Sequence, residues 1–277
     1  MLTVSSLHIY PVKSLAGITV PEARLTDRGF EYDRRWILVD DNNQFLTQRE
    51  IPGMALVKVE IQKETMTFLH QQFLTSTLVI PLKPESTKLH LIQVWDDQCQ
   101  VLHVSKKADE WFSDMLSYPC RLMYMPDHSP RPVDEKYAFD NNLTNLSDAF
   151  PIMMIGQASL DDLNARLEMP LPMNRFRPNI VFTNGSPYEE DEMEMFKVGG
   201  MEFYGVKLCG RCNITTIDQQ TSIAGKEPLR TLSSYRKRNN NVYFGQNLLY
   251  KGEGSIRTGD TIDVVRRKAS AFSKVTI

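Results

Sequence analysis

Short apolar runs, each bounded by turn residues, recur along the chain and constrain its fold more than any other feature of the sequence. The clearest pair is Met195–Val198 and Met201–Val206, joined by Gly199-Gly200, because two glycines allow the positive backbone dihedral angles of a tight hairpin turn. Apolar residues at helical spacing are much rarer, and the convincing cases are 107–116 and 159–167. The pattern predicts an α+β chain that is mostly β.

A second feature is the stretch Val206–Asp218, in which two cysteines, a glycine and an arginine occupy the consecutive positions from Cys209 to Cys212. The predicted hairpin precedes these residues, and the β-branched run Ile214–Ile217 that follows them favours a strand. The sequence therefore predicts a short loop between two strands that presents thiols to a ligand. This loop is where we expect the chemistry.

Three kinds of cysteine site fit the surrounding residues poorly. A structural zinc site needs four ligands at matching spacing, yet the histidines all lie upstream of the loop, the last of them at His128. A thioredoxin-like pair would open a helix, whereas a β-branched run follows here. A hydrolase nucleophile would need a nearby histidine, and none follows His128. A thiolate that binds a soft metal or carries a persulfide remains, and Arg211 would favour its charged form.

Charged side chains at the ends of predicted strands form a third feature. Lys13 and Ser14 follow the first strand, where they either face a ligand or are solvated as loop residues usually are. Arg34 and Arg35 enter an apolar strand and need partners, since an unpaired buried charge is costly. Asp33 could satisfy one of them, and the other could face an anion.

Arg175 and Arg177 lie two positions apart before another strand. In extended backbone they would point to the same face, where paired guanidinium groups suit a phosphate. An ion pair with the acidic run Glu189–Glu194 is an equally good reading of the same residues.

Composition argues against several broad classes. The net charge of -2 gives the chain no general attraction to nucleic acid or acidic membranes, so we expect neither as a partner. No run of about 18 apolar residues is present, and the N-terminus has no basic segment followed by a long apolar run, so neither a membrane span nor a secretory signal is predicted. Four cysteines in 277 residues do not suggest a disulfide framework, and a reducing cytoplasm is the simplest setting.

The motifs, taken together, have a known counterpart. The cysteine stretch reads Cys-Gly-Arg-Cys-x-x-Thr-Thr-x-Asp from Cys209 to Asp218. Other pieces follow in matching order: Tyr10-Pro11-Val12-Lys13-Ser14, Asp33-Arg34, Ser147-Asp148, Phe176-Arg177-Pro178-Asn179 and Phe244-Gly245-Gln246-Asn247. This series resembles MOSC-domain proteins, a family that includes the mitochondrial amidoxime-reducing components and their bacterial relatives. The resemblance covers nearly the whole chain.

The resemblance implies a β-rich N-terminal domain at residues 1–125, packed against a β-barrel MOSC domain at 126–268, with a tail at 269–277. It also implies a molybdenum–molybdopterin cofactor in the cleft, with Cys212 as the catalytic ligand to molybdenum and Cys209 not bound to metal. The residues that would hold the pterin and its phosphate are Lys13, Ser14, Arg34, Arg177, Asn179 and Arg211, with Ser147 and Asn174 as further contacts.

The function implied by the resemblance is the reduction of small N-hydroxylated substrates (hydroxylamines, amidoximes or N-hydroxylated bases) to amines by removal of the oxygen atom. We expect no iron–sulfur cluster within this chain, since its four cysteines cannot hold one while Cys212 ligates molybdenum. Electrons would then come from a partner protein, such as a ferredoxin- or flavodoxin-type reductase system. One alternative is a sulfur carrier or cofactor-handling protein that uses a persulfide on Cys212. Another is a β-rich binding module with inert cysteines.

Overall fold

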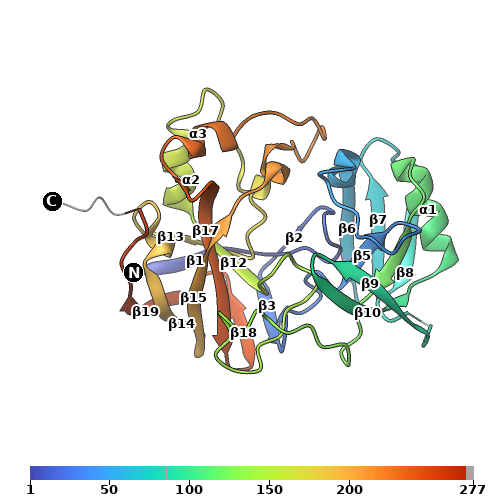
Figure 1. Cartoon of the computed structure of the whole chain (residues 1–277), viewed down its shortest axis with the longest axis horizontal. Helices are drawn as coiled ribbons and strands as arrows, with labels where there is room; N and C mark the ends of the chain where they lie inside the picture. The colour runs from blue at the N-terminus through green and yellow to red at the C-terminus, as the bar shows by residue number, and fades with distance from the viewer. Residues whose placement is uncertain (85, 273–277) are drawn as a thin grey trace.

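The computed structural model describes residues 1–84 and 86–272, so the end of the predicted tail, 273–277, lies outside the described residues. A sheet that closes on itself occupies one side of the molecule, because β17 pairs with β12 as well as with β15 (Figure 1). In order of pairing, its strands are β12 (Ile152–Gly156), β13 (Ile180–Thr183), β1 (Leu2–Ile9), β19 (Thr261–Arg267), β14 (Met193–Val198), β15 (Met201–Gly210) and β17 (Asn241–Lys251). The mostly-β fold and the β-barrel are both confirmed.

The first strand of the chain belongs to this barrel. β1 lies between β13 and β19, with Leu7 opposite Ile180 and Leu2 opposite Ile262, and Figure 1 shows it in blue among the yellow and red strands. Its apolar side chains join the barrel core, which buries Val4 and Leu7 completely. The domain division near residue 125 stays a prediction, and a strand from the N-terminal end completes the barrel of the C-terminal part.

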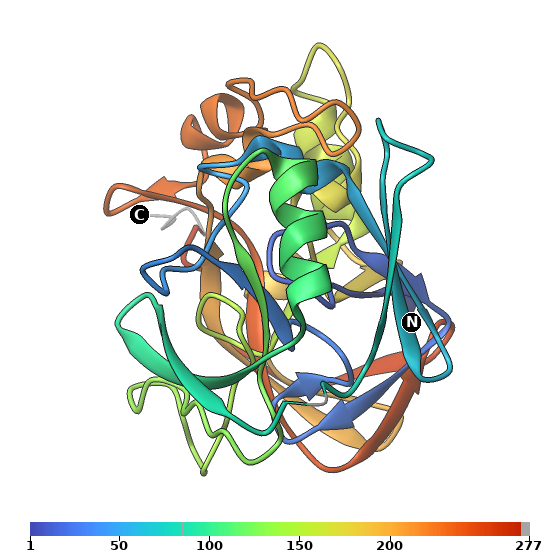
Figure 2. The same cartoon turned by 90° about the vertical axis from the view of Figure 1, so that its right-hand side faces the viewer.

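The N-terminal lobe contains two smaller sheets and one helix. One sheet has the order β5 (Trp36–Val39), β11 (Arg121–Tyr124), β10 (Asp97–His103) and β9 (Leu89–Val94), and the other runs β6 (Val57–Gln62), β7 (Thr65–His70) and β8 (Thr77–Pro81). The predicted helix is α1 (Lys106–Leu116), which lies at the front in Figure 2. Ser105 caps it, and Phe112 on its buried face packs edge-on against Phe68 of β7.

Short elements complete the described chain. The remaining strands are β2 (Ile18–Val20), β3 (Glu22–Thr26), β4 (Gly29–Phe30), β16 (Lys237–Arg238) and β18 (Gly254–Arg257). The remaining helices are α2 (Gln157–Asn164) and α3 (Leu229–Ser233), with 3-10 turns η1 (Pro52–Leu56), η2 (Met173–Arg175), η3 (Glu189–Asp191) and η4 (Asn213–Thr216). Within the described part of the chain, no helix has the length and apolar character needed to cross a membrane.

Candidate functional site

A cavity of about 370 Å³ gathers side chains from segments that lie far apart in the sequence. Eight of the residues predicted for the site line it: Lys13, Ser14, Arg34, Ser147, Arg177, Asn179, Arg211 and Cys212. Asn174 does not line it and is exposed on η2. The structure thus brings the predicted residues together, while the role of each toward a cofactor stays a prediction.

The cysteine loop differs in shape from the prediction. β15 continues through Cys209, and η4 replaces the strand expected at 214–217. The hydroxyl of Thr215 donates to the carbonyl of Cys212 at 2.9 Å, and that of Thr216 donates to the carbonyl of Asn213 at 2.7 Å. These local bonds fold the β-branched run into a turn despite its strand propensity. The turn leaves the Cys212 side chain exposed at the cavity.

The other cysteine of the loop is less accessible. Cys209 is half-buried, and burial raises the pKa of its thiol, an effect that the nearby charge of Arg211 opposes. The two thiols therefore differ in exposure, and Cys212 is the one open to an incoming ligand.

Two arginines lie together on one wall of the cavity. The guanidinium groups of Arg34 and Arg177 lie 4.4 and 4.3 Å from the ring centroid of Tyr10. Arg34 is neutralised, since it donates to the carboxylate of Asp33 at 2.7 Å and to Asn179 at 3.0 Å. Arg177 donates no side-chain hydrogen bond to any described residue, and burial lowers its pKa to about 10. Its charge is available to a bound anion.

Three of these cavity residues have left-handed backbone. The φ angles of Ser14, Arg34 and Arg177 are 66°, 45° and 55°. Such conformations cost about 1–3 kcal/mol for residues other than glycine and are found preferentially at functional sites. They also explain why the extended backbone expected at 175–177 is wrong.

Arg175 lines the same cavity as Arg177, but its side chain is bonded within the protein. It is buried on η2, where it donates to the carbonyl of Thr215 at 2.9 Å and lies 3.4 Å from the carboxylate of Asp218. The acidic run around Glu189 pairs with other arginines, so the expected ion pair between Arg175 and this run is wrong. Through these contacts to Thr215 and Asp218, Arg175 supports the segment that follows the two cysteines.

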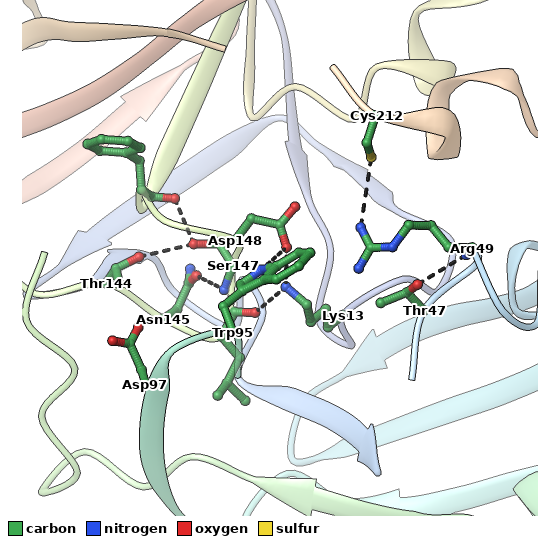
Figure 3. Close-up of polar contacts among 12 residues, drawn as sticks. Lys13, Thr47, Arg49, Trp95, Asp97, Thr144, Asn145, Ser147, Asp148 and Cys212 are labelled. Atoms are coloured by element: carbon green, nitrogen blue, oxygen red, sulfur yellow. Dashed lines mark hydrogen bonds and ion pairs between the residues drawn. The ribbon is translucent and has the colours of Figure 1, made fainter. Parts of the chain in front are cut away.

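A lysine and a carboxylate meet on another wall (Figure 3). Lys13 is buried, so the solvated-loop alternative is wrong, and its ammonium donates to Asp148 at 2.6 Å and to the carbonyl of Leu146 at 3.0 Å. Burial opposes ionisation of Asp148, but the charge and hydrogen bond of Lys13 hold the pKa of that carboxyl well below its usual range. Trp95 donates to the same carboxylate oxygen at 3.1 Å. Burial lowers the pKa of Lys13, and the charge and hydrogen bond of Asp148 oppose that effect.

The remaining predicted residues use much of their hydrogen-bonding capacity inside the protein. The Ser147 hydroxyl donates to the carbonyl of Phe150 at 2.7 Å, and Asn179 contacts Arg34, Met153 and the carbonyl of His8. Arg211 is different. Its Nη2 donates to the carbonyl of Phe176 at 2.8 Å, while its buried Nε has no partner among the described residues.

Several lining residues were missed by sequence reasoning, and the charge balance depends on them. The charged residues that line the cavity are Lys13, Arg34, Arg175, Arg177, Lys207, Arg211 and a single carboxylate, Asp148. Asp148 stands in a motif of the sequence, but Lys207 has no signal beyond its charge.

Among the described residues there is no cluster of three or more His, Cys, Asp or Glu side chains that could hold a metal. The chain can thus offer a metal one exposed sulfur, and a ligand that carries the metal must bring other donors and negative charge. Molybdopterin, with its dithiolene and phosphate, fits these residues.

Comparison with known protein families agrees with this geometry. Residues 1–119 match the model of the MOSC N-terminal beta barrel domain, and residues 141–263 match the MOSC domain. Mitochondrial amidoxime-reducing component 1 from mouse (Mus musculus) is 33% identical over 283 residues, which cover 94% of this chain and 81% of that protein. The human (Homo sapiens) protein of the same name is 31% identical over 279 residues, with 94% and 82% coverage.

A third relative has a different name. Molybdenum cofactor sulfurase from rice (Oryza sativa subsp. japonica) is 28% identical over 275 residues, which cover 90% of this chain and 32% of the rice protein. The family resemblance seen in the sequence is confirmed: this chain belongs to the MOSC-domain family and carries both the MOSC N-terminal domain and the MOSC domain.

Proposed function

We propose that this protein is a molybdenum-cofactor-dependent oxidoreductase that reduces small N-hydroxylated compounds, such as amidoximes and hydroxylamines, by removing the oxygen atom. The observation that carries the proposal is that the exposed Cys212 thiol shares one cavity with the cations Lys13, Arg34, Arg177 and Arg211. A soft sulfur donor suits molybdenum, and cations suit the phosphate of the pterin. The names of the mouse and human relatives support the substrate class.

When bound, the cofactor supplies the two-electron chemistry, and the protein binds and orients it. Cys212 contributes one thiolate ligand, while Arg177 and the free Nε of Arg211 bind the anionic end of the cofactor. Asp148 pairs with Lys13 on another wall of the cavity and opposes the lowering of the lysine pKa by burial. We place the electron donor in a separate protein of the ferredoxin or flavodoxin type.

Metal analysis and turnover test the proposal together. Protein expressed with ample molybdate should contain stoichiometric molybdenum by mass spectrometry and should reduce benzamidoxime with an artificial electron donor. Cys212→Ala should lose both properties, whereas Cys209→Ala should keep the metal, because the Cys209 thiol is less exposed than that of Cys212. Persulfide sulfur on Cys212 without molybdenum under the same conditions would contradict the proposal and assign sulfur transfer or cofactor handling instead.

A further inference from the structure

Arg49 is a cation that the N-terminal lobe presents directly to the thiol. Its Nη1 lies 3.9 Å from the Sγ of Cys212, and Figure 3 shows the side chain reaching from its turn toward the sulfur. We propose that Arg49, held in place by Trp95, is a specificity-determining residue that selects N-hydroxylated substrates carrying an anionic group such as a carboxylate. The substrate class rests on the proposed function, whereas the contact between Arg49 and Cys212 lies within this chain.

Trp95 holds the guanidinium in position. The centre of the Arg49 guanidinium lies 4.7 Å from the Trp95 ring centroid, a cation–π contact. The ring is itself fixed on two sides, by edge-on packing against Phe45 at 5.2 Å and by the hydrogen bond from its Nε1 to Asp148. Trp95 also has a φ of 56° in the turn between β9 and β10, an uncommon angle for a bulky side chain. Such strain, beside the contacts to Arg49 and Asp148, is consistent with a functional constraint on this turn.

The charge of Arg49 is poorly matched by its neighbours. Its nearest carboxylate belongs to Glu50, at 3.6 Å and 57% exposed, where solvent weakens the attraction. The Arg49 side chain donates no hydrogen bond to an oxygen acceptor among the described residues, so its forked N–H groups are free for a carboxylate or phosphate. Asp148, the other charged group near Trp95, already pairs with Lys13. A substrate that approaches Cys212 therefore meets a positive charge whose only ion pair among the described residues is weakened by solvent.

Arg49 is distinct from the cations assigned to the cofactor phosphate. Arg34 and Arg177 meet at the ring of Tyr10, whereas Arg49 contacts the sulfur that would hold the metal. A reacting substrate must come to the metal end of the cofactor. Arg49 is consequently placed to select the substrate.

Alkylation of Cys212 in cofactor-free protein tests the charge effect without any turnover. Iodoacetate is anionic and iodoacetamide is neutral, yet both react with the same thiolate, so the ratio of their rate constants does not depend on the ionisation of the thiol. In a Cys209→Ala background, Arg49→Gln should lower this ratio about fivefold, the effect of one unit charge at about 4 Å in water. Arg49→Lys should restore most of it. Arg166→Gln is the matched control, since Arg166 stacks on Tyr235 at 4.4 Å outside the cavity lining and should leave the ratio unchanged.

Kinetics of the molybdenum-loaded enzyme test the substrate class. Arg49→Gln should raise KM for a carboxylate-bearing benzamidoxime several-fold and leave KM for unsubstituted benzamidoxime nearly unchanged. If Arg49→Gln leaves the alkylation ratio unchanged in a protein that binds molybdenum and reduces benzamidoxime, the role of Arg49 is overturned while the proposed function stands. A lowered ratio in a protein that takes up no molybdenum would support anion selection at Cys212 and overturn both the oxidoreductase proposal and its substrate class.

Discussion

Replacement of Arg177 with methionine tests whether the cavity holds a charge that only a bound anion can satisfy. In the cofactor-free protein this guanidinium is largely buried, donates no side-chain hydrogen bond to the described residues and has a pKa lowered by burial to about 10. Methionine keeps much of the aliphatic packing and removes the charge. We expect Arg177→Met to be more stable than the wild type without cofactor and to bind the cofactor poorly.

The size of the effect follows from the lowered pKa. Each pH unit by which a pKa falls corresponds to about 1.4 kcal/mol of cost to the charged form, so burial of the Arg177 charge costs about 3 kcal/mol. Loss of the contact between Arg177 and the Tyr10 ring offsets about 1 kcal/mol of the gain. The net increase in the free energy of unfolding is then about 2 kcal/mol, or roughly 6 °C in Tm for a chain of this size.

Urea unfolding of cofactor-free protein measures this change, and Arg175→Met is the matched control. Arg175 lies two positions earlier and donates to the carbonyl of Thr215, so its removal leaves that buried acceptor without its donor and should lower the free energy of unfolding by about 1–2 kcal/mol. Molybdenum content after expression with molybdate should fall strongly in Arg177→Met. If Arg177→Met loses as much stability as Arg175→Met, the reasoning is refuted.

The pH dependence gives the same test a second readout. Because the pKa of Arg177 is lowered in the folded state, the cost of its charge is fully present below about pH 10 and is relieved as the pH rises beyond that value. The difference in stability between Arg177→Met and the wild type should be constant from about pH 6 to pH 9 and shrink above pH 10.

Two further substitutions probe buried charge elsewhere. Arg236→Met should lower the free energy of unfolding by about 3–5 kcal/mol, since it leaves Asp191, fully buried and 2.6 Å away, without its cation. Burial raises the pKa of that carboxyl, so the penalty should be larger at pH 8 than at pH 5.5 in urea unfolding, while the exposed control Arg166→Met stays within about 0.5 kcal/mol. Asp148→Asn should cost about 1–2 kcal/mol at pH 7, because the exposed side of its pair with Lys13 is screened by solvent. Since the pKa of Asp148 is lowered, this difference should persist above about pH 4 and disappear as the pH falls further, which circular dichroism during acid unfolding would show.

The parts of the fold that could be predicted from the sequence are mostly those set by residues close together in the chain. The hairpin of β14 and β15 forms around Gly199 and Gly200, whose φ angles of 55° and 84° are those that favour glycine. The helix predicted at 107–116 is present at Lys106–Leu116. In both cases the deciding residues are neighbours in sequence, so their effect can be read without knowledge of the rest of the fold.

The candidate site depends on contacts that no local pattern reports. Arg49 and Cys212 are 163 positions apart, and Trp95 and Asp148 are 53 apart, so an isolated arginine in a turn gives no hint of its partner. The motifs of the family did identify eight of the lining residues, because each motif fixes which residue stands at which position of the chain. Where propensity alone was used, at Ile214–Ile217, side-chain hydroxyl bonds to the backbone decided the structure instead.

The pairing of β1 with β13 and β19 has a consequence for how the protein is made. On the ribosome this strand emerges long before β13 and β19 have been synthesised, although the adjacent β2 can pair with Leu7–Ile9 at once. The ring can close only once β19, the last of its strands along the described chain, has been made. We therefore expect any cofactor to enter a polypeptide whose earliest and latest barrel strands are already joined edge to edge.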